Sequence, residues 1–180
     1  MAYGSSRAIA MDRPAQWLAL LRIVVGLYFV KAVLAKLALV TVAGFLPVPE
    51  TSARWIATLP VLVARQAAGN PIAWYHDFLV NTVLPHARLF AHLTAWGEVV
   101  VAVSLTLGLM TGLGSLVGLV LVANYGLATQ WMSSTQQGFH LLLFALMLAF
   151  FFARAGRTWG LDAPLARGRP KSSLTKRPFA

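Results

Sequence analysis

The chain has 180 residues, of which 58% are hydrophobic and only 11% charged, and its mean hydropathy is +0.70. Soluble domains are about half apolar and a quarter charged, so this composition excludes a soluble globular protein and indicates an integral membrane protein. The formal net charge of +10 does not indicate nucleic-acid binding. Seven of the fifteen basic residues follow the last apolar stretch, where such residues set the orientation of a membrane protein. The chain contains no cysteine, which excludes disulfides, thiolate metal sites and thioether-linked haem.

The first apolar stretch, 17–45, predicts one membrane crossing. It is too long for a cleaved signal peptide and lacks a small-residue cleavage pattern, so we expect it to remain in the mature protein. At 100° per residue, Arg22 and Lys36 share a stripe with Phe29, while Lys31 points the opposite way. Arg22 and Lys36 are about 21 Å apart along the helix, so we expect them near the cytoplasmic and outer faces respectively, in different sites.

The following segment, 47–88, contains five prolines and two apolar runs, 55–64 and 72–84. Both runs are too short or too interrupted to cross a bilayer. With Trp55, Trp74 and Tyr75 at headgroup level, they predict interfacial or re-entrant helices on the extracytoplasmic face.

Residues 89–153 contain Glu98 as their only Asp, Glu, Lys or Arg. A hydrocarbon core about 30 Å thick needs roughly 20 apolar residues per helix, so three crossings are predicted at about 89–110, 113–131 and 136–153. Gly108, Gly112, Gly114 and Gly118 form a small-residue series that favours close helix packing, a structural role. The predicted fold class is all-α: an integral membrane four-helix bundle with short interfacial helices between helix 1 and helix 2.

The basic residues predict the topology. Nine lysines and arginines lie in the two terminal tails, against three in the segment 47–88. By the positive-inside rule, both termini are cytoplasmic in a bacterial-type inner membrane and 47–88 is extracytoplasmic. We therefore expect one transmembrane domain over 1–165 and a basic cytoplasmic tail over 166–180 that contacts anionic lipid rather than nucleic acid.

Three motifs carry a resemblance to a known family. They are Leu20-Leu21-Arg22-Ile23-Val24-Val25-Gly26 followed by Lys36, Gly97-Glu98 leading into Leu107-Gly108-Leu109-Met110-Thr111-Gly112, and Ala155-Gly156-Arg157-Thr158-Trp159-Gly160-Leu161-Asp162. In this order, over most of 17–165, they resemble the DoxX/DoxD-like membrane proteins. The long segment before helix 2 is similar to the DoxD type, the small subunit of thiosulfate:quinone oxidoreductase.

The resemblance implies a four-helix bundle that acts beside another membrane protein subunit in quinone-linked electron transfer. Its recurring polar positions match Arg22, Glu98, Arg157 and Asp162 in this chain. Arg54, Arg65 and Arg88 are scattered along the outer segment, so no cradle of basic residues for thiosulfate is predicted.

Glu98 has two interpretations that the sequence leaves open. It lies near the depth of Lys31 and within about two turns of Lys36, so a structural ion pair with one of these lysines is favoured. The alternative is a catalytic role, in which Glu98 accepts a proton from a quinol. Both interpretations place its side chain inside the bundle.

Further polar residues are candidate contacts for a quinone or pigment: Arg22, Lys36, Asn124, Tyr125 and His140. His92 and His140 both fall near outer helix ends, where a shared haem or chlorophyll-type ligand is conceivable, but their spacing does not specify a metal and ordinary amphipathic side chains are favoured. No metal site is predicted. Arg157 and Asp162 are interpreted as a structural cap at the exit of helix 4, with Arg22 as an alternative partner of Asp162.

Two functional hypotheses follow. The first is a membrane subunit of a quinone-linked oxidoreductase, with thiosulfate as one candidate electron donor. The second is a non-catalytic accessory subunit packed against a larger respiratory or photosynthetic membrane complex. The sequence leaves open whether the chain is itself catalytic.

Overall fold

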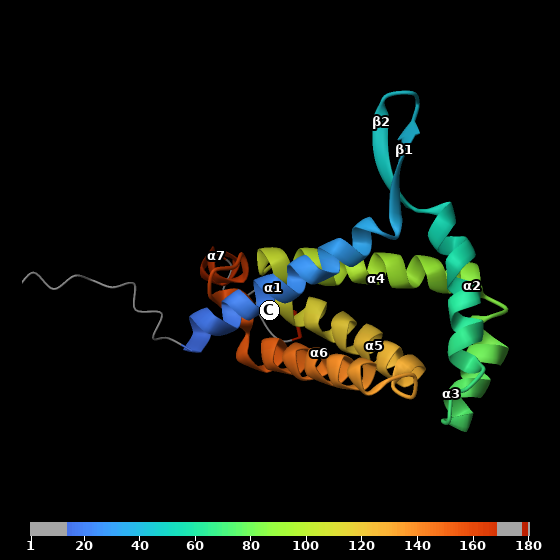
Figure 1. The fold of residues 1–180 in the computed structure, drawn as a ribbon. Coiled ribbons are helices and arrows are strands. Elements are labelled where there is room, and N and C mark those ends of the chain that lie inside the picture. Colours follow the sequence, from blue (N-terminus) through green and yellow to red (C-terminus); the bar gives the residue numbers. More distant parts are fainter. Residues whose placement is uncertain (1–13, 169–177, 180) are drawn as a thin grey trace, which may run out of the picture.

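The computed structural model describes residues 14–168 and 178–179. The 1–13 segment and most of the predicted basic tail lie outside these residues. The elements are α1 (Pro14–Leu34), β1 (Leu37–Val42), β2 (Leu46–Thr51), α2 (Ala53–Ala67), α3 (Ala73–Phe78), a π-helical turn η1 (Leu79–Val83), α4 (Ala87–Leu107), α5 (Thr111–Thr129), α6 (Ser134–Ala153), a 3-10 turn η2 (Ala155–Arg157) and α7 (Asp162–Gly168) (Figure 1).

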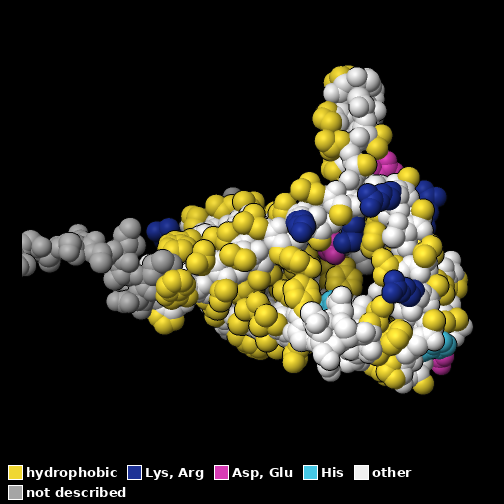
Figure 2. Space-filling view, in the orientation of Figure 1, with side chains coloured by type: hydrophobic (Ala, Val, Ile, Leu, Met, Phe, Trp, Pro, Cys, Tyr) yellow, Lys and Arg dark blue, Asp and Glu magenta, His cyan; other side chains and the backbone are white. Residues whose placement is uncertain are grey.

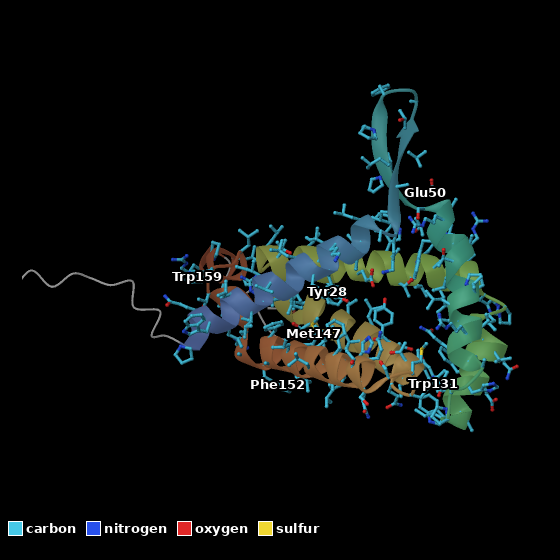
Figure 3. All side chains as sticks on the ribbon, viewed as in Figure 1. Tyr28, Glu50, Trp131, Met147, Phe152 and Trp159 are labelled. Atoms are coloured by element: carbon cyan, nitrogen blue, oxygen red, sulfur yellow. The ribbon has the colours of Figure 1, made fainter. Side chains whose placement is uncertain are left out.

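Four of these helices are long and apolar enough to cross a membrane: α1, α4, α5 and α6, with 21, 21, 19 and 20 residues. The protein is therefore a multi-pass membrane protein with an all-α bundle. Hydrophobic side chains cover much of the bundle surface, as lipid contact requires (Figure 2). Trp131 and Trp159 lie at opposite ends of the bundle, where aromatic side chains anchor a helix at the lipid headgroups (Figure 3).

The predicted crossings at 89–110, 113–131 and 136–153 lie close to α4, α5 and α6, but the first crossing is shorter than its predicted range of 17–45. The helix ends at Leu34, and β1 and β2 form an antiparallel hairpin in which Val40 pairs with Val48. The physical reason lies in the residue types. The β-branched run over 40–42 favours a strand, and Pro47 and Pro49, two residues apart, each lack the N–H that a continuing helix would need.

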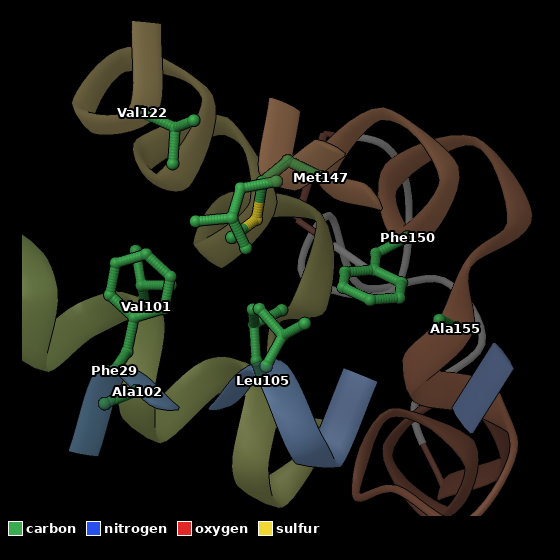
Figure 4. Close-up of a cluster of buried hydrophobic side chains, with 10 residues drawn as sticks. Phe29, Val101, Ala102, Leu105, Val122, Met147, Phe150 and Ala155 are labelled. Carbon is green, nitrogen blue, oxygen red and sulfur yellow. The ribbon is translucent and has the colours of Figure 1, made fainter. Parts of the chain in front are cut away.

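The bundle core lies between α1, α4, α5 and α6. Its buried side chains come from all four helices, with one residue from η2 (Figure 4): Val25, Phe29, Val101, Ala102, Leu105, Val122, Leu143, Met147, Phe150 and Ala155. Glycines let the helices approach closely. A Cβ atom on Gly114 would collide with Ser104 of α4, and one on Gly118 would collide with Met147 of α6. These two predicted packing glycines of α5 therefore face two different neighbours.

The segment between the first two crossings forms α2, α3 and η1, which lie across one end of the bundle (Figure 1). The predicted short runs 55–64 and 72–84 fall on these elements. Leu59, Val63 and Tyr75 belong to a second buried cluster that joins them to α4 and α5. Asn70 adds a hydrogen bond from its Nδ2 to the carbonyl of Leu127, at 3.0 Å.

Arg22 and Asp162 lie at the opposite end of the bundle, and both are fully buried. Arg22 donates to the carbonyls of Leu105 at 2.6 Å and Trp159 at 3.0 Å. Asp162 accepts hydrogen bonds from the backbone N–H groups of Met110 at 2.6 Å and Thr111 at 3.0 Å. Within the described part of the chain no ion pair joins Arg22 to Asp162, because each side chain bonds to the backbone of a helix end instead.

A second hydrogen-bond acceptor, besides Asp162, binds the N–H groups at the start of α5. The carbonyl of Phe179 accepts from Gly112 N at 3.0 Å and from Leu113 N at 3.3 Å. Asp162 and Phe179 together satisfy the four N–H groups that a helix leaves without an internal partner. Gly108, with φ of +64°, ends α4 just before this turn, a left-handed backbone that a glycine adopts without strain.

Candidate functional site

Glu98 is the centre of a buried polar triad. Its Oε2 accepts from Lys36 Nζ at 2.6 Å, and its Oε1 accepts from the Tyr125 hydroxyl at 2.8 Å. Residues from three segments therefore meet here, since Lys36 follows α1, Glu98 is on α4 and Tyr125 is on α5. The predicted ion pair is confirmed with Lys36 as the partner, whereas Lys31 is exposed.

Helical periodicity explains why Glu98 points inward. The buried positions on α4 include Ala91, Ala95, Ala102 and Leu105, and Glu98 continues that three- and four-residue spacing. Its side chain is 3% exposed, against 14% for Lys36. A carboxylate at this depth needs a compensating charge and hydrogen-bond donors on both oxygens, and Lys36 and Tyr125 provide them.

A polar cavity of about 250 Å³ adjoins the triad. Besides the triad, the lining residues with polar groups are Tyr28, Trp55, Gln66, Thr129, Gln136 and His140. Figure 2 shows acidic, basic and histidine side chains together in a hollow of the surface near the end of α1. The Lys36 ammonium also lies 4.8 Å from the centre of the Trp55 ring, so α2 contributes a cation–π contact to the same site.

A larger and mostly apolar cavity of about 670 Å³ lies between α2, α3 and η1 on one side and α4 and α5 on the other. Its volume falls within the range of roughly 300–1,000 Å³ that is usual for organic ligands. Tyr75 of α3 lines it and donates from its hydroxyl to the carbonyl of Asn124 at 2.9 Å. Burial raises the pKa of Tyr75 to about 12, so its hydroxyl keeps its proton at neutral pH.

The two cavities share two lining residues, Tyr125 and Gln66. Tyr125 therefore forms part of both walls while its hydroxyl holds the Glu98 carboxylate. A ligand at this junction would meet an apolar space on one side and a buried carboxylate on the other.

The family model for the small subunit DoxD of TQO, thiosulfate:quinone oxidoreductase, matches residues 17–177. The chain belongs to the DoxD family. The matched region contains both cavities of this DoxD protein and its four membrane-spanning helices, apart from the first three residues of α1. Neither the curated proteins nor the solved structures contain a significant match.

The structure brings some of the predicted quinone contacts of the DoxD protein together and separates others. Lys36, Tyr125 and His140 line the polar cavity, and Asn124 lines the apolar cavity. Arg22 lies at the far end of the bundle, bonded to the carbonyl of Leu105. Arg157 is exposed, outside both cavities.

His92 and His140 line different cavities of the DoxD protein. The Nδ1 atom of His92 lies 2.8 Å from the Thr51 hydroxyl, and that of His140 lies 2.8 Å from the carbonyl of Gln136. Over residues 14–168 and 178–179, no group of three His, Cys, Asp or Glu residues is placed to hold a metal ion. The arrangement gives no support to a shared haem or pigment between these two histidines.

Gln66 is a site residue that sequence reasoning missed. Among the described residues its side chain has no hydrogen-bond partner, and it opens into both cavities. A signal was present, because Leu59, Val63 and Gln66 follow a four- and three-residue spacing that puts them on one face of α2. A glutamine that continues the apolar face of an interfacial helix marks a polar position directed toward the protein.

Proposed function

We propose that this DoxD-family protein is the membrane subunit of a quinone-linked oxidoreductase. The quinone tail occupies the 670 Å³ apolar cavity, and the ring lies at its junction with the polar cavity. The observation that carries the proposal is the position of Tyr125, which lines both cavities and donates to Glu98. The family description, a subunit of thiosulfate:quinone oxidoreductase, supports the same chemistry.

Reduction of a quinone to a quinol consumes two electrons and two protons. In the proposed reaction, the Tyr125 hydroxyl turns from Glu98 toward a ring oxygen and transfers its proton to it. The Lys36 ammonium, 2.6 Å from Glu98, supplies the replacement proton, which the carboxylate passes to the Tyr125 phenolate, so that Glu98 ends as a carboxylate again. Solvent at the exposed side of the polar cavity returns a proton to Lys36, and the cycle runs twice for each quinone.

The electrons come from a second subunit in this proposal. The described outer surface offers exposed arginines at Arg54, Arg65 and Arg88, spread over α2 and the start of α4, rather than one anion-binding cluster. Oxidation of a sulfur anion such as thiosulfate is therefore assigned to the partner, and quinone binding to this chain.

A pair of substitutions on α4 tests the quinone cavity. Val100 lines it and is 38% exposed, whereas Val103, one turn away and 46% exposed, does not. Val100→Phe should weaken binding of a short-chain quinone analogue at least tenfold, and Val103→Phe should leave it unchanged. Quenching of Trp96, which also lines the cavity, reports binding in detergent micelles.

Quinone carried through purification in native lipids gives a second measurement. The wild-type protein and Val103→Phe should retain it, and Val100→Phe should lose it. Equal binding by both variants would place the quinone elsewhere. Absence of quinone from the intact protein, together with comigration in a large redox complex, would favour the accessory-subunit hypothesis instead.

A further inference from the structure

The β1–β2 hairpin projects from the end of the bundle where α1 and α2 meet, at a steep angle to α4 (Figure 1). Because α4 crosses the membrane, the hairpin extends along the membrane plane rather than away from it. Its apolar side chains are uncovered, with Leu39 74% and Phe45 79% exposed. Among the described residues only the base of the hairpin is held, where Thr51 is buried against His92 of α4, and an isolated two-stranded hairpin is only marginally stable in water.

The pairing register decides which edge of the hairpin is open. Ser52 N donates to Lys36 O at 2.8 Å, so Lys36 and Ser52 form a hydrogen-bonded pair. Such pairs alternate along an antiparallel ladder, so the even-numbered residues of the two strands bond to each other. The backbone groups of the odd-numbered residues point outward. On β2 the outward positions include Pro47 and Pro49, which have no N–H to offer. The outer edge of β2 is therefore blocked.

The outer edge of β1 has no such block. Its outward positions are Leu37, Leu39 and Thr41, and the N–H and C=O groups of each bond to no backbone group of residues 14–168 or 178–179. The strand carries no charge and no proline, the features by which proteins usually protect an exposed edge. An uncharged edge of this kind pairs with another extended strand.

We propose that β1 pairs with β1 of a second copy of this chain, forming a four-stranded sheet in the order β2, β1, β1, β2. Two copies with one membrane orientation are related by a two-fold axis along the membrane normal. Such an axis reverses the direction of a strand that lies in the membrane plane, so the two β1 strands run antiparallel. The outward positions are symmetric about Leu39, and the register centred on Leu39 pairs all three of them.

Introduced cysteines test this pairing in the full-length protein, because the chain has none of its own. Across the axis the two Leu39 residues form a hydrogen-bonded pair with Cα atoms about 5.5 Å apart, a distance that a disulfide spans. Leu39→Cys should therefore form a covalent dimer in native membranes with copper phenanthroline. Val48→Cys is the matched control, because its two copies would be three strand spacings, about 14 Å, apart.

We expect at least tenfold more dimer from Leu39→Cys than from Val48→Cys. Equal yields, or a cross-link to a protein of different mass, would overturn the proposal. Leu39→Pro provides a second measurement, since it removes an outward N–H but keeps the bonds within the hairpin, as Pro49 does on the other strand. In lipid nanodiscs the wild type should have the mass of two copies and Leu39→Pro that of one. A wild-type monomer would refute the pairing, whatever the quinone cavity binds.

Discussion

Replacement of Glu98 by glutamine tests the energetic role of the buried triad. Glutamine keeps an amide oxygen that accepts from Tyr125, but it no longer neutralises Lys36. Loss of one partner from a buried ion pair costs about 3–5 kcal/mol. Lys36 is 14% exposed and reaches water in part, so we expect the lower end of that range, about 3 kcal/mol.

The reverse substitution strands the more deeply buried group. Lys36→Met leaves the Glu98 carboxylate, 3% exposed, with the Tyr125 hydroxyl as its one remaining donor in the triad, and should cost at least as much as Glu98→Gln. The double variant Glu98→Gln/Lys36→Met contains no uncompensated charge. It should therefore be more stable than the sum of the two losses predicts, by about 2 kcal/mol or more.

Reversible unfolding in mixed detergent micelles, followed by tryptophan fluorescence, gives the four free energies of this cycle. Tyr125→Phe serves as a reference, because it removes a single hydrogen bond to a charged group, worth about 1.5–3 kcal/mol. Additivity of the two single losses to within about 0.5 kcal/mol would refute the structural reasoning. A Glu98→Gln variant that is as stable as the wild type would refute it too. If that variant kept its stability but lost quinone turnover, proton transfer would be the role of Glu98.

Three other predictions concern different parts of the molecule. A cysteine at Phe45, in the exposed hairpin, should react with an impermeant reagent from outside intact cells, and a cysteine at position 173 should not; the opposite pattern would invert the topology. The raised pKa of Tyr75 should contribute stability that is complete below pH 10 and is lost as the pH rises toward about 12, and Tyr75→Phe should remove that part of the pH profile in unfolding experiments. Gly118→Leu should collide with the Met147 side chain and cost about 1–3 kcal/mol, whereas Gly138→Leu, with open space around its Cβ, should unfold at the wild-type denaturant concentration within error.

The membrane-spanning helices were predictable because hydrophobic length is a local property of the sequence. An ion pair at Glu98 was predictable for a related reason, since a lone carboxylate among apolar residues requires a cation. The sequence left Lys31, at the nearer depth, and Lys36 as alternatives, and the structure shows Lys36 as the partner. The Tyr125 hydrogen bond was not predictable, because it depends on how α5 is rotated against α4, and the glycine series of α5 gave no unique register.

The hairpin shows a different limit. Hydropathy sums over 17–45 count Leu39 and Val40 as membrane residues, whereas the structure places them in an exposed strand. The β-branched run over 40–42 and the two prolines at 47 and 49 were present in the sequence, but they became informative only with the register that Ser52 and Lys36 establish. The two cavities were likewise beyond sequence reasoning, because α2 packs beside α4 and α5 through contacts distant along the chain.

The capping of α5 has a consequence for synthesis. Residues 111–129 leave the ribosome before residues 162 and 179, and until those residues reach the start of α5 its first N–H groups can bond only to water. Arg22 also lacks one of its hydrogen-bond acceptors until Trp159 has been made, because it donates to the carbonyl of that residue. This end of the bundle therefore closes after all four crossings are in place. A chain that ended before Asp162 would contain all four crossings, but the N–H groups at the start of α5 would remain open to water.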